Sequence, residues 1–199
     1  MATDIGQILD KIRLLESELD AEVARSRAKL HFGLERGKLI FEQEVVRRHA
    51  EMKTSLFAYL SDAHPLMFIT APFIYALIVP LVLLDLFVSL YQAVCFPAYG
   101  IAKVKRADYF VFDRRYLAYL NAIEKLNCAF CSYANGLLAY VSEISSRTEQ
   151  FWCPIKHARR LQGTHRRYRN FVEFGDADAY SAKLATLRGK LANPDQSPD

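Results

Sequence analysis

The sequence predicts an all-α protein built around one membrane-embedded segment, and three observations carry this prediction. Residues 64–102 are almost continuously apolar. The regions on both sides carry apolar residues in helical steps of three and four. Strand-like alternation does not recur, and there is no internal repeat. We expect an amphipathic N-terminal region (1–63), the membrane segment (64–102), a helical Cys/His domain (103–191) and a disordered tail (192–199).

The N-terminal region begins with an amphipathic helix. Its apolar stripe has the a/d spacing of a coiled coil, with residues Ile5, Ile8, Ile12, Leu15 and Leu19. The pattern ends before three heptads are complete, so packing on the same chain and association into a homo-oligomer are both open. A second helix is expected from Lys38 to Leu60.

The central segment is long enough to be embedded in a lipid bilayer. A helix needs about 20 apolar residues to cross the hydrocarbon core, and the segment holds a single formally charged side chain, Asp85. A buried helix in a soluble protein would need more surrounding chain than 199 residues leave. Asp85 should face protein, water or the membrane interface, because an unpaired acid in lipid is costly.

Two arrangements of this segment are open. One is a single tilted span from about Leu66 to Leu90, and the other is a re-entrant helical hairpin that bends near Pro80. Basic residues favour the cytoplasmic side, and they lie on both flanks of the segment, which favours the hairpin with both ends inside. The flanking residues are Arg47, Arg48, Lys53, Lys103, Lys105, Arg106, Arg114 and Arg115. The N-terminus lacks a secretory signal, so the segment is also the expected targeting signal.

Several helices are predicted after the membrane segment. Asp113 is a plausible N-cap for a helix that continues to about Leu126, and a further helix follows CAFCSYANG. Pro154 suits the first turn of another helix, and THRRYRNFVEF reads as a short basic and aromatic helix. A last amphipathic helix is expected from Asp176 to Leu191.

The strongest chemical constellation is Cys128-x-x-Cys131 with Cys153-x-x-x-His157. Three thiolates and one imidazole form a common closed, tetrahedral zinc set, and iron is an alternative because sulfur-rich sites suit both metals. His165 could serve as a substitute ligand. Four protein ligands leave no open position, so the site would be structural rather than hydrolytic.

Other interpretations of these cysteines are open. Cys128 and Cys131 could pack as small apolar residues, or they could form a dithiol redox pair. The four cysteines are too few and too unevenly placed for a disulfide-rich secreted scaffold, which favours reduced thiols or metal ligands in a cytoplasmic domain.

A basic run follows the last cysteine. It contains Lys156, Arg159, Arg160, Arg166, Arg167 and Arg169, interleaved with aromatic residues. Beside a membrane segment, anionic lipid headgroups are the expected partner and nucleic acid is not. A solvated helix face would give the same pattern.

The stretches APFIYALIVPLVLLDLFVSLYQ, CFPAYGI, DRRYLAYLNAIEKLNC, CSYANG and RTEQFWCPIKHARR cover about the central half of the chain. With them the chain resembles a family of uncharacterised bacterial inner-membrane proteins. The resemblance implies a bacterial inner-membrane location and no assigned activity.

The leading hypothesis is a membrane-anchored, non-enzymatic scaffold or assembly module, with a zinc-stabilised cytoplasmic domain. The alternative is a membrane-bound redox or electron-transfer protein that uses the same cysteines as an iron centre or dithiol. A third hypothesis is an oligomeric channel or transporter built around Asp85.

Overall fold

The computed structural model describes residues 2–28, 32–35, 38–41 and 43–192. The all-α prediction is confirmed, since helices account for most of these residues and the strands form one short hairpin. The predicted disordered tail falls outside the described residues, apart from Ala192. The chain divides into two compact units, one formed by residues 1–61 and 113–125 and the other by residues 62–112 and 126–199.

The first unit begins with the long helix α1 (Ala2–Ala28). Strands β1 (Phe32–Glu35) and β2 (Lys38–Phe41) follow and pair antiparallel. Helices α2 (Gln43–Glu51) and α3 (Leu56–Ser61) come next, and the short 3-10 helix η2 (Asp113–Tyr116) joins the unit later in the chain.

The predicted helix from Lys38 to Leu60 is therefore wrong in two places. Its first residues form β2, whose backbone pairs with β1. It is also interrupted after Glu51, and the Ser55 hydroxyl then accepts a hydrogen bond from the Ala58 N–H at 3.2 Å. This side-chain cap starts α3 as a separate helix.

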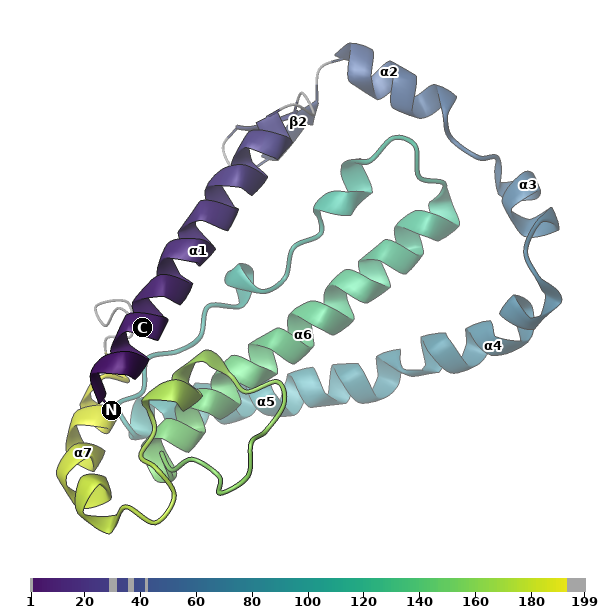
Figure 1. Ribbon diagram of the computed structural model, residues 1–199. Coiled ribbons are helices and arrows are strands. Elements are labelled where there is room, and N and C mark those ends of the chain that lie inside the picture. Colours follow the sequence, from purple (N-terminus) through teal and green to yellow (C-terminus); the bar gives the residue numbers. More distant parts are fainter. Residues whose placement is uncertain (1, 29–31, 36–37, 42, 193–199) are drawn as a thin grey trace. The chain divides into compact units, whose positions relative to one another are not determined.

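The apolar segment is a nearly unbroken pair of helices, α4 (Pro65–Ala76) and α5 (Ile78–Ala98), joined through Leu77 (Figure 1). The His64 side chain caps α4 by accepting from the Leu66 N–H. Leu77 keeps a right-handed helical backbone, and Pro80 lies in the first turn of α5, where a missing N–H costs nothing. The bend near Pro80 that a hairpin requires is absent.

Helix α6 (Ala122–Trp152) is the longest element described, and it runs in the same direction as α5 (Figure 1). It begins with a reciprocal cap, in which the Asn121 side chain accepts from the Glu124 N–H and the Glu124 carboxylate accepts from the Asn121 N–H. The predicted interruption near CAFCSYANG and the predicted N-cap at Asp113 are both wrong, because Asp113 begins only the short helix η2.

The core of the second unit lies between α5, α6 and the end of the chain. Phe96, Leu137, Ile144 and Leu191 are all buried there. Gln92 of α5 is also buried, and its amide bonds both the Val104 backbone and the Tyr140 hydroxyl. Because every polar group of Gln92 is paired, its burial does not leave an uncompensated polar atom in the core.

After α6 the chain is mostly irregular. Residues 153–165 form a loop, η3 (Arg166–Asn170) is a single 3-10 turn, and α7 (Ala177–Gly189) closes the chain. The helices predicted after Pro154 and over THRRYRNFVEF are therefore wrong, or reduced to that turn. The last predicted helix is present, with Asp176 as its N-cap through a 2.9 Å bond from the Ala179 N–H.

Candidate functional site

The structure does not bring the four proposed metal ligands together. Cys128 and Cys131 lie near the start of α6, whereas Cys153 follows its last residue. The 24 intervening residues are all helical, so Cys128 and Cys153 are separated by 25 residue steps, or about 37 Å at 1.5 Å per residue. Among the described residues, no three His, Cys, Asp or Glu side chains are grouped as metal ligands would be.

His157 and His165 have partners other than cysteine. The His157 ring stacks on Tyr168, with centroids 6.3 Å apart. The His165 Nε2 atom lies 2.8 Å from a Glu149 carboxylate oxygen. A Cys3His zinc or iron site within one chain thus has no geometric support here, and zinc remains a prediction from sequence alone. Cys128 and Cys131 lie about one turn apart on α6, so the dithiol interpretation is compatible with the fold.

Asp85 is the centre of a polar cluster on α5. Its two carboxylate oxygens accept hydrogen bonds from the Arg106 guanidinium, one of them at 2.6 Å, and from the Tyr133 hydroxyl at 2.9 Å. Ser89, one turn away, donates a longer bond of 3.3 Å. Burial raises the pKa of the Tyr133 phenol, so it stays protonated and keeps donating to the carboxylate.

Arg106 is held in place by more than its ion pair. Its guanidinium carbon lies 4.0 Å from the centre of the Phe110 ring and 5.8 Å from that of Tyr140. A guanidinium stacked on aromatic faces and bound bidentately to a carboxylate has little freedom to leave. The acid that the sequence places in the apolar segment is thus neutralised within its own chain.

A second charged cluster lies at the carboxyl-terminal half of α6. Glu143 accepts from Arg147 at 2.7 Å and from Arg167 at 2.8 Å, and all three side chains are mostly buried. Burial raises the pKa of the Glu143 carboxyl, but the two arginines outweigh burial and hold that pKa below its ordinary value. Arg147 also donates to the Ala102 carbonyl at 2.6 Å, so the cluster ties α6 to the chain after α5.

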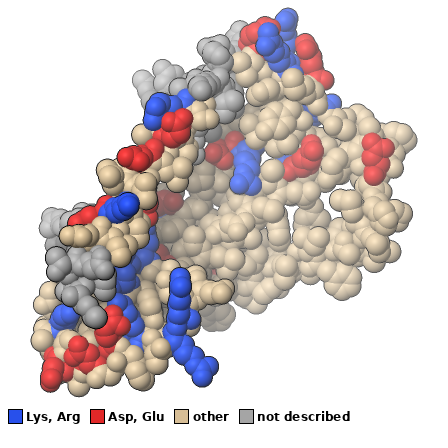
Figure 2. Space-filling model, viewed as in Figure 1, with Lys and Arg blue, Asp and Glu red and all other residues tan. Residues whose placement is uncertain are grey.

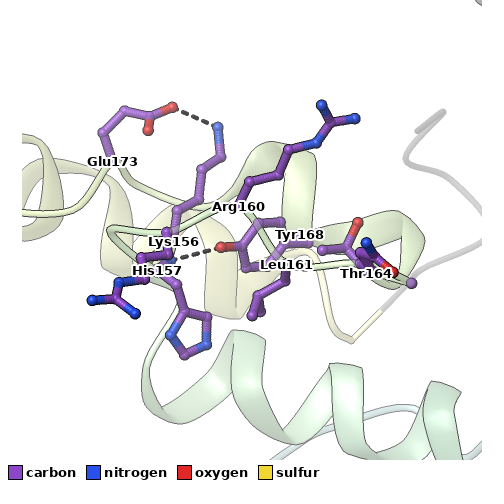
Figure 3. Close-up of a pocket in the computed structure, with 10 residues that line it drawn as sticks. Lys156, His157, Arg160, Leu161, Thr164, Tyr168 and Glu173 are labelled. Carbon is purple, nitrogen blue, oxygen red and sulfur yellow. Dashed lines mark hydrogen bonds and ion pairs between the residues drawn. The ribbon is translucent and has the colours of Figure 1, made fainter.

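The predicted basic run divides between interior and surface. Arg167 belongs to the buried cluster, and Lys156 forms a 2.6 Å ion pair with Glu173. Arg159 and Arg160 are exposed and form no ion pair among the described residues. They line a polar pocket of about 830 Å³, which is formed by the loop from Lys156 to Thr164 together with Tyr168 and Glu173 (Figure 3).

Both ends of this loop are fixed. The Lys156 N–H donates to the Val172 carbonyl at 2.7 Å, and the His157 N–H donates to the Tyr168 hydroxyl at 2.6 Å. Figure 3 shows Lys156 and Arg160 extending to the same side of the loop. Because the Tyr168 hydroxyl accepts one bond, its own proton remains available to a ligand. The lining carries more positive than negative charge, which suits an anion such as a phosphate group.

The apolar stripe of α1 is exposed. Ile8, Ile12, Leu15 and Leu19 have between 41% and 63% of their surface accessible, so packing within the first unit does not cover the stripe. The side chain of Ile5, the first residue of the predicted seam, lies outside the described residues.

Comparison with protein-family models, curated proteins and solved structures finds no match to this chain. The function is therefore argued from the exposed apolar helix pair, the Asp85 cluster, the basic loop and the α1 stripe.

Proposed function

We propose that the protein is a membrane-anchored assembly module, held in the bilayer by α4 and α5 and associated with further copies through α1. One observation carries the anchoring. The helix pair from Pro65 to Ala98 is long and apolar enough to cross a membrane, and its most apolar stretch has no buried residue. Figure 2 shows a broad surface without charged side chains over these helices. Removing that much apolar surface from water is strongly favourable.

The Asp85 cluster supports the same proposal. An ionised acid facing lipid costs about 2.5–3.5 kcal/mol on insertion scales. Arg106, Tyr133 and Ser89 satisfy the carboxylate inside the protein, so the apolar surface of α4 and α5 carries no uncompensated charge. A paired acid held by a stacked arginine also gives the channel hypothesis no specific support.

The folded region after α5 packs directly on the proposed membrane anchor. The second half of α5 enters the core through Gln92 and Phe96 instead of ending in a linker. The folded C-terminal residues are therefore attached rigidly to the membrane helix. The basic loop adds a contact for anionic lipid headgroups, since Arg159 and Arg160 are the exposed positive charges of its pocket.

Self-association is supported by the seam on α1. With Ile12 and Leu15 at positions a and d, Lys11 occupies a g position and Glu16 the following e position. In a parallel pair of helices these two residues face each other across the seam and attract. A second copy of α1 is therefore the partner that both the apolar stripe and its flanking charges fit.

One matched pair of variants tests this association. Leu15→Asp places a charge in the seam, whereas Leu14→Asp makes the same change on the adjacent residue outside the seam. Both leucines are exposed, with 54% and 59% of their surface accessible. Sedimentation in mild detergent should show wild type and Leu14→Asp as oligomers and Leu15→Asp as monomer. Equal behaviour of the two variants would rule out this seam, and a wild-type chain washed from membranes by alkaline carbonate would rule out the anchor.

A further inference from the structure

We propose that α4 and α5 lie along one leaflet of the bilayer as a monotopic anchor, so that both flanks of the apolar segment stay on the same side of the membrane. The inference rests on the proposed anchoring and adds its geometry. The exposed face of the helix pair would contact the acyl chains of one leaflet along its whole length.

First, the two faces of the helix pair differ in polarity. The polar side chains of the segment that bond residues distant in sequence reach α6 or the chain after α5. Tyr75 bonds Asn127, Asp85 bonds Tyr133 and Arg106, and Gln92 bonds Tyr140. Asn127, Tyr133 and Tyr140 all lie on α6. The face toward α6 is thus polar at intervals from the end of α4 to the last turns of α5.

The opposite face is apolar and exposed over the same length. Its residues include Phe73, Leu77, Leu83, Leu86, Phe87, Leu90 and Val94, each with at least half of its surface accessible. The helix pair is about 50 Å long at 1.5 Å per residue, whereas the hydrocarbon core is about 30 Å thick. A helix upright in the bilayer would leave part of this apolar face in water. A helix lying in the leaflet covers all of it.

The second argument is that chain segments before and after the helix pair pack together. Residues 1–61 and 113–125 form one compact unit. Within it, the His49 and Tyr119 rings meet edge to face with their centroids 5.2 Å apart. A transmembrane helix would place residue 49 and residue 119 on opposite sides of the bilayer unless the chain crossed again. An in-plane helix allows this contact directly.

The third argument is the path of the chain after α5. Val104 bonds Gln92 and Arg106 bonds Asp85, so the chain turns back along α5 as soon as the helix ends. Lys103, Lys105 and Asp108 on this returning segment are exposed. Its backbone is mostly irregular and its charges need water, and a hydrocarbon environment would satisfy neither. The face that carries it therefore points to the aqueous side, opposite to the apolar face.

The test is the sidedness of the two flanks in the full-length chain. Ser17 and Ser181 are exposed and lie before and after the helix pair. With the four native cysteines changed to serine, each is replaced in turn by cysteine (Ser17→Cys, Ser181→Cys). A membrane-impermeant maleimide is then applied to sealed vesicles of both orientations. We expect both positions to react in the same vesicle orientation and neither to react in the other.

Labelling of the two positions in opposite orientations would overturn the inference and leave the anchor intact. Recovery of the chain in the soluble fraction would instead overturn the anchor itself, so the two failures are distinguishable. If the cysteine-free chain does not fold, proteolysis of the wild type in sealed vesicles gives the same readout. Peptides from α1 and α7 must then be released from the same vesicle orientation, and release from opposite orientations counts against the proposal.

Discussion

At the residue scale, Gly136 shows how close packing sets a residue's identity. It lies inside α6, where glycine costs about 1 kcal/mol relative to alanine. A Cβ atom there would meet the Tyr109 carbonyl oxygen at 2.6 Å and the Phe110 ring at 3.4 Å. The returning segment thus crosses α6 at a distance that only glycine permits.

Gly136→Ala should therefore destabilise the protein by about 1–3 kcal/mol, since overpacking against backbone outweighs the gain in helix propensity. Gly189→Ala is the matched control, because that glycine is also helical and a Cβ would meet nothing within 4 Å. Thermal unfolding in detergent should show a lower midpoint for the first variant and an unchanged or higher one for the second. A stabilised Gly136→Ala would mean that the returning segment does not pack here.

Glu143 carries a mostly buried charge that is paired with two arginines. Removing one partner of a mostly buried ion pair costs about 3–5 kcal/mol, because the remaining charge loses its compensation. Glu143→Gln would leave the charges of Arg147 and Arg167 without the carboxylate that compensates them. Glu173→Gln, which breaks the exposed pair with Lys156, should cost under about 1 kcal/mol. If denaturant unfolding shows the same loss of unfolding free energy for Glu143→Gln and Glu173→Gln, burial does not set the cost of losing the charge.

The same carboxyl predicts a pH dependence. The pKa of Glu143 is lower in the folded protein than in the unfolded chain, so its contribution is complete above the ordinary glutamate range. That contribution is lost as the pH falls through the lowered pKa, because folding then no longer favours the ionised form. Wild-type stability should fall in this acidic range, and Glu143→Gln should show a smaller fall. Parallel pH profiles would assign the acid sensitivity to other groups.

At the scale of elements, the exposed face of α4 and α5 is the surface that the proposed anchor would place against lipid. Phe73 and Phe87 lie on it, the first in α4 and the second in α5, two residues beyond Asp85. Phe174 is a similarly exposed phenylalanine in the loop before α7. The three side chains differ in the element that carries them, and much less in their exposure.

An acid at Phe73 or Phe87 should weaken membrane retention. The change from phenylalanine to aspartate costs about 3 kcal/mol at the centre of a membrane helix. We expect Phe73→Asp and Phe87→Asp to lower the fraction that stays with membranes after an alkaline carbonate wash, and Phe174→Asp to leave it unchanged. Retention of Phe87→Asp at the wild-type level would confine the lipid contact to the segment before Asp85.

At the scale of the whole molecule, the three proposed activities use different elements. The proposed anchor is α4 and α5, the proposed self-association seam is on α1, and the proposed headgroup contact is the loop from Lys156 to Thr164. Each function can therefore be removed without the others, which is what the variants above rely on.

The basic loop predicts a preference for anionic lipid, worth about 1 kcal/mol per basic residue near the surface. A ligand that binds the folded state raises its unfolding midpoint. In nanodiscs, phosphatidic acid should raise the midpoint above that in pure phosphatidylcholine. Arg159→Gln combined with Arg160→Gln should remove this rise, whereas Lys183→Gln combined with Lys190→Gln removes two exposed charges from α7 and its C-cap and should preserve it. A rise that persists without the two arginines would place the lipid contact elsewhere.

The sequence by itself determined the helical class, the apolar segment and its single acid. These features follow from the composition and periodicity of residues that are neighbours in the sequence. It also holds two local signals that match the structure. Asn121 and Glu124 have the spacing of a reciprocal helix cap. The short apolar stretches FGL and LIF flank the polar, glycine-containing ERGK, which is a spacing typical of a hairpin.

Only the tertiary structure decided how far apart the cysteines lie and which residue pairs with Asp85. Helix α6 continues through Gly136, where the returning segment packs against it, and this continuity separates Cys128 from Cys153. The partner of Asp85 is Arg106, which lies 21 residues later and reaches the acid because the chain turns back along α5. Local patterns are silent on both points, since each depends on contacts between segments that are distant in sequence.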